Sequence, residues 1–534
     1  MTNKEIASYF KLTAQLMELH NENPFKIKSY TNAAFKIAKS SVSFNEVSEN
    51  ELVKIDGIGK SIAEKITELL NSGSIAYLEE LLLKTPQGIV EMLSVKGIGP
   101  SKVKIIWQDL GAETVGELLY ACNENRLASI KGFGQKTQEE IRKAIEYKIS
   151  SQGKYHYASI ENYAEDLIRQ IRKQYPELRI SLTGEIRRKC EIISQIDVLV
   201  GKPDFSFEFS KSEYFTLPIN LITCLENEFI EALFNTTGTK THNSKINVLT
   251  TNCKSEEEIY QTNNLPYIIP EMREGLDEFE WVKKYSSDAI VKHSDLKGIL
   301  HNHSTWSDGA NTLEEMALYC KELGFEYLGI CDHSKSAFYA NGLNEDRVLA
   351  QQQEIDTLNK QLQPFTIFKG IESDILFDGS LDYTNDILKT FDFIVASVHS
   401  NLKMDEQKAT ERLIRAVENP YTTILGHPTG RLLLSRQGYP INHKKVIDAC
   451  AQNTVAIELN ANPMRLDMDW RWIYYAMEKG VNIAINPDAH NKQGYHHMHY
   501  GVCAARKGGL IKSMTLNAFS KEEVATYFSL KKSR

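Results

Sequence analysis

The chain has 534 residues, long enough for several domains, and combines 42% hydrophobic with 25% charged residues. The formal net charge is −8, so a nucleic-acid function must rest on local features rather than on an overall positive charge. No apolar run approaches the roughly 20 residues that cross a bilayer, and Met1–Phe10 lacks the apolar centre of a signal peptide. The eight cysteines are scattered without a CxxC pair, which predicts free thiols in a reducing cytoplasm and no zinc ribbon.

Residues 1–150 are predicted to be helical. Apolar residues recur at helical spacing in three segments, Ile6–Leu19, Ile62–Leu70 and Ile141–Ile149. Short glycine-containing turns separate the helices, and we expect one helical domain at 1–90 and a second at 91–150.

Three Gly-x-Gly turns are the main signal in this helical region. An apolar residue stands two positions before each turn, and a helix is predicted to follow. Glycine lets a backbone approach a phosphate, and the free N–H groups at the start of a helix can bind it. The pattern predicts helix-hairpin-helix motifs that bind DNA without sequence preference; ordinary turns between helices are the alternative. The residues are the apolar Ile55, Val95 and Ile130, the glycines Gly57, Gly59, Gly97, Gly99, Gly132 and Gly134, and the lysines Lys60, Lys102 and Lys136.

Residues 151–290 change to a mixture of helix and strand. The segment Ile160–Lys173 has the apolar spacing of a long helix. We expect a small α+β domain here, because several short β-rich runs follow that helix. These runs are Arg179–Thr183, Gln195–Val200, Asn220–Cys224 and Ile246–Thr250.

Residues 291–534 alternate regularly between β-rich runs and amphipathic helices. About seven β/α units in succession predict a closed or nearly closed α/β barrel, whose reactive residues stand at the carboxyl ends of the strands. Helices are expected at Leu313–Leu323, Glu345–Leu362 and Lys444–Cys450, among others. The β-rich runs end near His303, Asp332, Glu372, His399, His427, Asn460 and Asp488.

Histidines and carboxylates gather at these predicted strand ends. His301 and His303 are two residues apart on one strand, so both side chains point to the same face. Nitrogen and oxygen ligands without sulfur suit Mn, Zn or Fe in a catalytic site, and the set is too large for one ion. We expect two or three divalent ions, bridged by a carboxylate such as Glu372, although any one of these residues alone would be an ordinary barrel-end side chain. The candidate ligands are His301, His303, Asp308, His333, Glu372, His399, His427, Asp488 and His490.

Other histidines are predicted to lie outside this site. The spacing of His496, His497 and His499 fits no single strand or helix face, so we expect no metal role for them. His443 begins a predicted helix, where we expect it to be solvated.

The motifs at the strand ends resemble those of the PHP (polymerase and histidinol phosphatase) family. This resemblance implies a distorted seven-stranded barrel, a trinuclear metal centre and hydrolysis of phosphoesters. It also implies that Asn460 lines the same pocket and that Glu372 and Asp488 take part in catalysis. The motifs are His301-Asn302-His303, Ser307-Asp308-Gly309, Asp332-His333-Ser334, Gly370-Ile371-Glu372, Gly426-His427-Pro428 and Asp488-Ala489-His490.

The first 290 residues resemble family X DNA polymerases. The segment Gly57–Ile66 is similar to their lyase segment, whose lysine forms a Schiff base with an abasic sugar. Lys65 would take that role only if its pKa were depressed; a solvated helix lysine is the alternative. The domain order resembles that of bacterial family X polymerases with a C-terminal PHP domain. The motifs similar to the polymerase palm and thumb are Thr183–Arg188, Gln195–Asp197, Thr237–Asn243, Leu265–Tyr267 and Pro270–Glu274.

The chain departs from that family where nucleotide transfer takes place. The family holds two Mg²⁺ ions with three aspartates, but the positions here are Gln195, Asp197 and Asn220. A neutral amide cannot balance a divalent ion as a carboxylate does, so we expect no secure Mg²⁺ site. Glu185 replaces a serine that contacts the nucleotide and should repel a triphosphate. The departures predict a degenerate polymerase site, in which Arg187 and Arg188 could still contact a DNA phosphate.

The resemblance implies a cytoplasmic DNA-repair phosphoesterase, with 3′→5′ exonuclease as the main expected activity. Its DNA partners would be gapped, nicked or 3′-end substrates, and cleavage at abasic sites or removal of 3′-phosphates also fits. The alternatives are an active gap-filling polymerase with PHP proofreading, a non-catalytic DNA-binding scaffold and a small-molecule phosphatase.

Overall fold

The structure is a computed structural model that describes residues 1–40, 42–55, 57–95, 97–150, 153–209, 217–247 and 253–532. It divides into two compact units, residues 1–148 and 149–534. Each unit holds two of the four predicted domains, so the boundaries near residues 90 and 290 stay predictions. None of the helices described here has both the length and the apolar character needed to cross a membrane.

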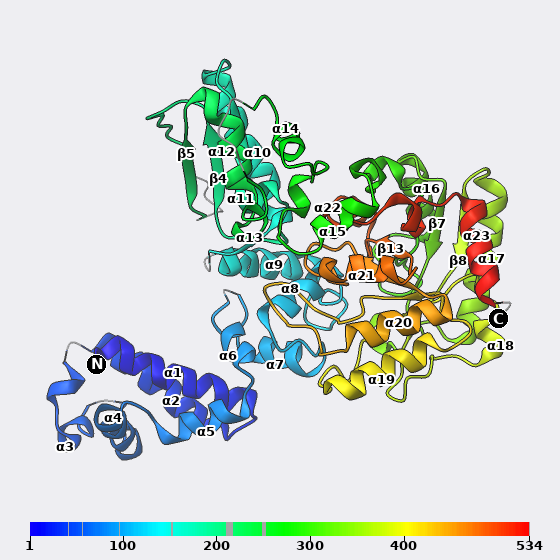
Figure 1. Cartoon of the computed structure of the whole chain (residues 1–534). Coiled ribbons are helices and arrows are strands. Elements are labelled where there is room, and N and C mark those ends of the chain that lie inside the picture. The colour runs from blue at the N-terminus through cyan, green and yellow to red at the C-terminus, as the bar shows by residue number, and fades with distance from the viewer. Residues whose placement is uncertain are drawn as a thin grey trace. The chain divides into compact units, whose positions relative to one another are not determined.

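The first unit is helical, as the sequence predicts. α1 (Asn3–Leu19) and α2 (Pro24–Lys39) lie side by side (Figure 1). Thr2 caps α1 in a capping box with Glu5, and Pro24 opens α2 where a missing N–H costs little. The remaining helices are α3 (Glu49–Leu52), α4 (Lys60–Ser72), α5 (Ala76–Lys84), α6 (Gln87–Met92), α7 (Pro100–Gln108), α8 (Val115–Asn123) and α9 (Gln135–Ser150).

The second unit begins with a small mixed domain. α10 (Tyr157–Gln174) packs its apolar face on a sheet of order β2-β4-β5, whose central strand is fully buried. The register places Thr183, Asp197 and Asn220 in one row across the sheet. The strand expected at 246–250 lies outside the described residues from 248 onward. The elements are β1 (Tyr155–His156), β2 (Ile180–Thr183), α11 (Gly184–Arg187), β3 (Ile192–Ile193), β4 (Ile196–Val200), β5 (Ile219–Thr223), α12 (Phe229–Thr237), α13 (Lys240–Asn243), α14 (Glu256–Thr262) and α15 (Glu278–Lys284).

Eight short parallel strands form the centre of the C-terminal region. They make two sheets, of order β6-β7-β8 and β13-β12-β11-β10-β9. Isolated parallel bridges connect the two sheets: Asn302, after β6, pairs with Ala489, after β13, and His333, after β7, pairs with Glu372. The strands are β6 (Gly298–Ile299), β7 (Tyr327–Ile330), β8 (Thr366–Lys369), β9 (Glu372–Asp374), β10 (Val395–Ser397), β11 (Ile424–Leu425), β12 (Ala456–Asn460) and β13 (Ile483–Asn486).

The helices predicted between these strands are present, and α23 (Lys521–Lys532) covers the amino ends of the strands. Phe528 of α23 stacks on Phe393 at 4.8 Å and packs with the first residues of β7, β10, β11 and β12. The carboxyl ends and their loops therefore form the opposite, functional end. The other helices are α16 (Leu313–Glu322), α17 (Glu345–Gln361), α18 (Asn385–Leu388), α19 (Glu406–Val417), α20 (His443–Asn453), α21 (Ile473–Glu478) and α22 (Met498–Lys507).

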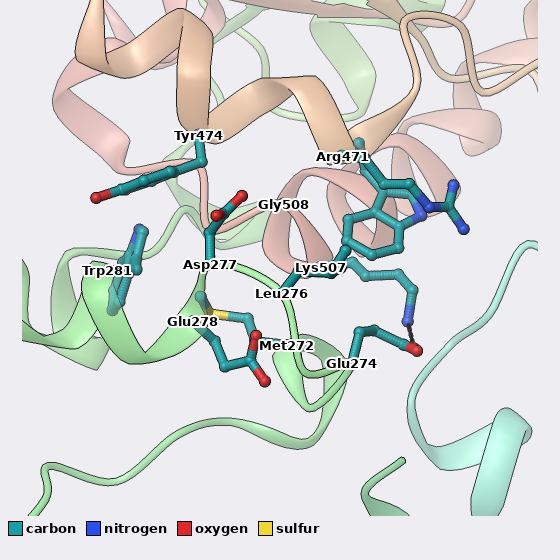
Figure 2. A pocket seen from close by; sticks show the side chains of 11 residues that line it. Met272, Glu274, Leu276, Asp277, Glu278, Trp281, Arg471, Tyr474, Lys507 and Gly508 are labelled. Atoms are coloured by element: carbon teal, nitrogen blue, oxygen red, sulfur yellow. Dashed lines mark hydrogen bonds and ion pairs between the residues drawn. The ribbon is translucent and has the colours of Figure 1, made fainter. Parts of the chain in front are cut away.

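Buried polar contacts join the mixed domain to the C-terminal region. Trp281 Nε1 donates a 2.7 Å hydrogen bond to the Gly509 carbonyl. Lys507 of α22 is buried and forms an ion pair with Glu274 (Figure 2). These contacts explain why the two parts make one compact unit.

Candidate functional site

Glu372 lies at the centre of the predicted metal centre. It is the first residue of β9, it is buried, and four imidazoles point at its carboxylate. The nitrogen–oxygen distances are 2.9 Å for His333, 3.1 Å for His427, 3.2 Å for His399 and 3.4 Å for His301. Each comes from the end of a different strand, so this one carboxylate is shared by four imidazoles.

The other two carboxylates extend the cluster. His303 Nε2 lies 3.0 Å from Asp488 Oδ1, and His301 Nε2 lies 3.5 Å from the same oxygen. Asp308 faces His490 at 3.4 Å and His333 at 3.7 Å. All nine predicted ligands are thus brought together, although they come from segments spread over almost 190 residues.

Several potential donor atoms have no hydrogen-bond partner in the protein, which suits metal coordination. His301 Nε2 and Asp308 Oδ2 are buried and make no hydrogen bond, although oppositely charged groups lie within 4 Å. Unpaired buried polar atoms are costly, and a coordinated cation would satisfy them. Three sets of side chains have their donor atoms close enough to share an ion: His303, Asp308, His333 and His490; His301, His303 and Asp488; His333, Glu372 and His399.

The electrostatics follow from burial of many charges in one small space. Burial lowers the pKa of His399, but Glu372 and Asp374 outweigh this and raise it to about 10. Burial and the neighbouring His490 and His333 lower the pKa of His303 to about 3. The pKa of Glu372 falls well below its usual value, because the surrounding imidazoles outweigh the effect of burial. The carboxylates are therefore ready to bind cations in their charged form.

Two carboxylates that the sequence did not single out orient these imidazoles. Glu458 Oε2 lies 2.6 Å from His301 Nδ1, and Asp374 Oδ1 lies 2.6 Å from His399 Nδ1. A carboxylate on the far nitrogen sets the orientation of a histidine and strengthens it as a ligand. The available signal was spacing: Glu458 stands two before Asn460 on β12, and Asp374 two after Glu372 on β9.

Asn460 and Asp332 complete the surroundings. Asn460 is buried and donates to Asp488 Oδ2 at 3.0 Å, so it lines the site as expected. Asp332 turns away from the ligands and accepts hydrogen bonds from the backbone N–H groups of Ser304 and Ser307. It therefore shapes the loop that carries Asp308.

The remaining histidines contact other groups. His496 meets the Tyr319 hydroxyl at 2.8 Å, and His499 meets Glu161 at 2.8 Å. Among the residues described, neither these two nor His497 belongs to a potential metal cluster. The expectation for His443 was wrong: its ring is half-buried and stacks on Trp472 at 4.6 Å, because α20 packs that face inward.

The three Gly-x-Gly turns share one geometry. In each, the N–H of the middle residue donates to the carbonyl of the preceding apolar residue, at 3.0–3.2 Å. The first glycines, Gly57, Gly97 and Gly132, have φ between +85° and +96°, a conformation that favours glycine. A Cβ atom added at the second glycines would meet no atom within 4 Å, so this backbone is open to a ligand. These are Gly59 and Gly99, which precede α4 and α7, and Gly134, which precedes α9.

The candidate lysines of this unit are not equivalent. Lys60 and Lys136 are exposed, whereas Lys102 donates to the Gly97 carbonyl at 3.2 Å. Lys65 forms a 2.5 Å ion pair with Glu68, which raises its pKa. A Schiff-base lysine needs a lowered pKa. This arrangement therefore favours the alternative that Lys65 is an ordinary lysine on a helix surface.

Gln195, Asp197 and Asn220, the positions that match the polymerase aspartates, are hydrogen-bonded to one another. Gln195 Nε2 and Asn220 Nδ2 each donate to Asp197 Oδ1 at 2.9 Å. Glu185, expected near a triphosphate, accepts from the backbone and hydroxyl of Ser194 at 2.9 and 2.8 Å. Amide donors thus surround the one remaining carboxylate, where the resembling family would place cations.

Arg187 and Arg188 are bound to carboxylates of the protein. Arg187 makes a bidentate pair with Glu256, at 2.6 and 3.0 Å, and Arg188 donates to Glu274 at 2.9 Å. Both guanidinium groups also bind Thr237. The idea that they are available for a DNA phosphate is therefore not supported, since the tertiary fold supplies carboxylates that the motif does not reveal.

Comparison with known proteins identifies the domain families of both regions. A helix-hairpin-helix domain family matches residues 1–75, and a SAM-like helix-hairpin-helix tandem matches residues 89–146. The PHP domain family matches residues 300–462. The chain is also 33% identical to the DNA polymerase/3′-5′ exonuclease PolX of Bacillus subtilis, over 99% of both chains. The chain belongs to the PolX family.

Shorter proteins resemble only part of the present chain. Probable phosphatases of Clostridium novyi and Caldicellulosiruptor bescii are 25% and 29% identical to it, each over 36% of this chain. Asp488 and His490 lie beyond the matched PHP range, and the fold returns them to the centre beside His303 and Asp308.

Proposed function

We propose that the chain is a DNA-repair phosphoesterase that acts mainly as a 3′→5′ exonuclease through its PHP centre. The observation that carries this proposal is the convergence of nine ligand-type side chains, Glu372 among them, in a chain that also has three helix-hairpin-helix turns. Gapped, nicked or free 3′ ends are the proposed substrates. Cleavage at abasic sites and removal of 3′-phosphates use the same chemistry.

The nine ligands would hold two or three divalent ions, with Glu372 as the bridge. Imidazole and carboxylate donors without thiolate favour Mn, Zn or Fe. Such ions would polarise a phosphoester and activate water. The protein itself holds His301 and His399 in orientation through Glu458 and Asp374, and it excludes solvent from the ligands by burial.

We further propose that the polymerase-like domain no longer incorporates nucleotides. Asp197 is the only carboxylate in its row, and two amides donate to it. Two Mg²⁺ ions would lack ligand charge there, and Glu185 adds a negative charge where a triphosphate should bind. The name of the Bacillus subtilis relative includes polymerase activity, so an active polymerase is the second candidate.

One experiment separates the candidates. The wild type and the His301→Ala/His303→Ala variant are incubated with labelled primer–template and Mn²⁺, with and without nucleotides. We expect shortening by the wild type, and neither shortening nor extension by the variant, whose DNA affinity stays nearly normal. Nucleotide-dependent extension by the variant would establish the polymerase, and undiminished shortening would refute the site. No change by the wild type would favour a scaffold, or a small-molecule phosphatase if the protein hydrolyses small phosphoesters.

A further inference from the structure

Exposed aromatic side chains of the C-terminal region are few, and two of them are neighbours in the loop that follows His333. Among its described residues, the Phe, Tyr and Trp side chains that are more than a third exposed are Phe338, Tyr339 and Phe377. They follow β7 and β9, the strands that lead to His333 and begin with Glu372. The other exposed large apolar residues there are leucines, such as Leu530 on α23 at the opposite end of the strands.

Phe338 is the most exposed of these aromatics, at 88%, and stands five residues after His333. The next ring, Tyr339, lies edge-on to His333 at 6.1 Å and to His399 at 6.5 Å, measured between ring centroids. Phe338 therefore stands at the rim of the centre. Moving such a ring out of water and against a binding partner is favourable.

The loop that carries Phe338 is held firmly. Ser336 donates its N–H to Asp382 at 2.6 Å and its hydroxyl to Asp374 at 2.9 Å. Asp374 is the residue that orients His399, so the loop and the metal centre share an anchor. At the far end of the loop, Arg347 donates to the Asn341 carbonyl at 2.8 Å. The backbone that carries Phe338 is thus anchored on both sides.

We propose that Phe338 is a stacking platform for an unpaired base near the 3′ end of the DNA. This inference rests on the proposed function and adds the substrate's strand state to it. A terminal phosphodiester that reaches the centre must bring its nucleosides to the rim. Every base has a π-face, so an aromatic ring there binds single-stranded ends of any sequence. Backbone contacts by the helix-hairpin-helix turns would be equally indifferent to sequence.

A protein–DNA double-mutant cycle tests the proposal. One single-stranded oligonucleotide carries normal bases at its 3′ end, and its matched partner carries tetrahydrofuran residues, which keep the backbone but lack bases. The full-length proteins are wild type, Phe338→Ala, Phe338→Trp and the control Leu530→Ala, which removes an exposed apolar side chain far from the centre. KM and kcat for shortening are measured in Mn²⁺.

We expect Phe338→Ala to raise KM for the base-bearing strand by about 5- to 150-fold, the range of one lost stacking contact. KM for the baseless strand should change by less than about twofold, because no π-face is present to lose. Phe338→Trp should restore the wild-type value, and Leu530→Ala should match it on both strands. Equal effects of Phe338→Ala on both strands, or no effect on either, would overturn the proposal.

Binding measured without cleavage separates this inference from the proposed function. Fluorescence anisotropy of the same oligonucleotides is recorded in excess chelator with the same full-length proteins. The wild type should bind the base-bearing strand more tightly, and Phe338→Ala should lose that preference. If the wild type shortens neither strand in Mn²⁺, the exonuclease proposal fails. The stacking proposal is then still tested by whether the wild type binds the base-bearing strand more tightly than the baseless one. No preference in the wild type would refute stacking, whatever the nuclease result.

Discussion

Glu274 offers a quantitative test of how the mixed domain and the C-terminal region are joined. Its carboxylate forms ion pairs with Lys507 of α22 and with Arg188, at 2.9 Å for the latter. Figure 2 shows the Lys507 side chain reaching this carboxylate on the side of the pocket opposite Trp281. Lys507 is 1% exposed, so the cation depends on Glu274 and on the carbonyls of Arg188 and Glu271.

The change Glu274→Gln keeps the shape and removes the charge. Two largely buried cations then face a neutral amide, and breaking such a pair costs about 3–5 kcal/mol. For a unit of about 390 residues, an unfolding entropy near 2.1 cal/mol/K per residue converts this into a Tm decrease of about 4–6 °C.

The pH dependence of the Tm difference provides a second test of the Glu274 ion pairs. Burial raises the pKa of Glu274, but the charges of Lys507 and Arg188 outweigh burial and lower it below its usual value. A carboxylate with a lowered folded-state pKa stabilises the protein above its unfolded value, about 4.3, and this stabilisation is lost as the pH falls. The Tm difference between wild type and Glu274→Gln should therefore be largest near neutral pH and shrink below about pH 4.

Differential scanning calorimetry of the full-length proteins measures this difference. The matched control is Glu280→Gln, since Glu280 forms an exposed pair with Lys283, and exposed pairs contribute little to stability. The reasoning is refuted if both variants lower Tm equally, or if the Glu274→Gln difference is the same at pH 7 and at pH 3.

Three further predictions concern DNA and metal. Gly59→Val and Gly99→Val, at positions where an added Cβ meets no protein atom within 4 Å, should fold normally yet weaken binding to unrelated duplexes alike in fluorescence anisotropy; loss for one sequence only would contradict backbone binding. Glu458→Gln should weaken metal affinity about 10- to 100-fold, because His301 loses its orienting carboxylate; an unchanged metal titration would show that the contact is dispensable. Chelation should stop DNA shortening and added Mn²⁺ should restore it; shortening that persists in excess chelator would exclude the proposed centre.

Much of the candidate site was predictable because its signals are local. The two-residue spacing of His301 and His303 places both on one face of a strand, and repeated β/α units bring strand ends together. The Gly-x-Gly turns were equally readable, because a positive φ at Gly57 and its counterparts is a property of the local backbone. These features need no knowledge of distant partners.

Other features were decided only by tertiary structure. Glu458 and Asp374 became orienting groups because β12 and β9 lie in a particular order and register around the centre. Arg188 pairs with Glu274, 86 positions away, which a motif read along the chain cannot reveal. Local spacing states which face a side chain occupies, whereas its partner across the fold depends on sheet order and packing. The sequence by itself thus determined which residues could bind metal and DNA phosphate, and the tertiary structure decided which charges were already paired.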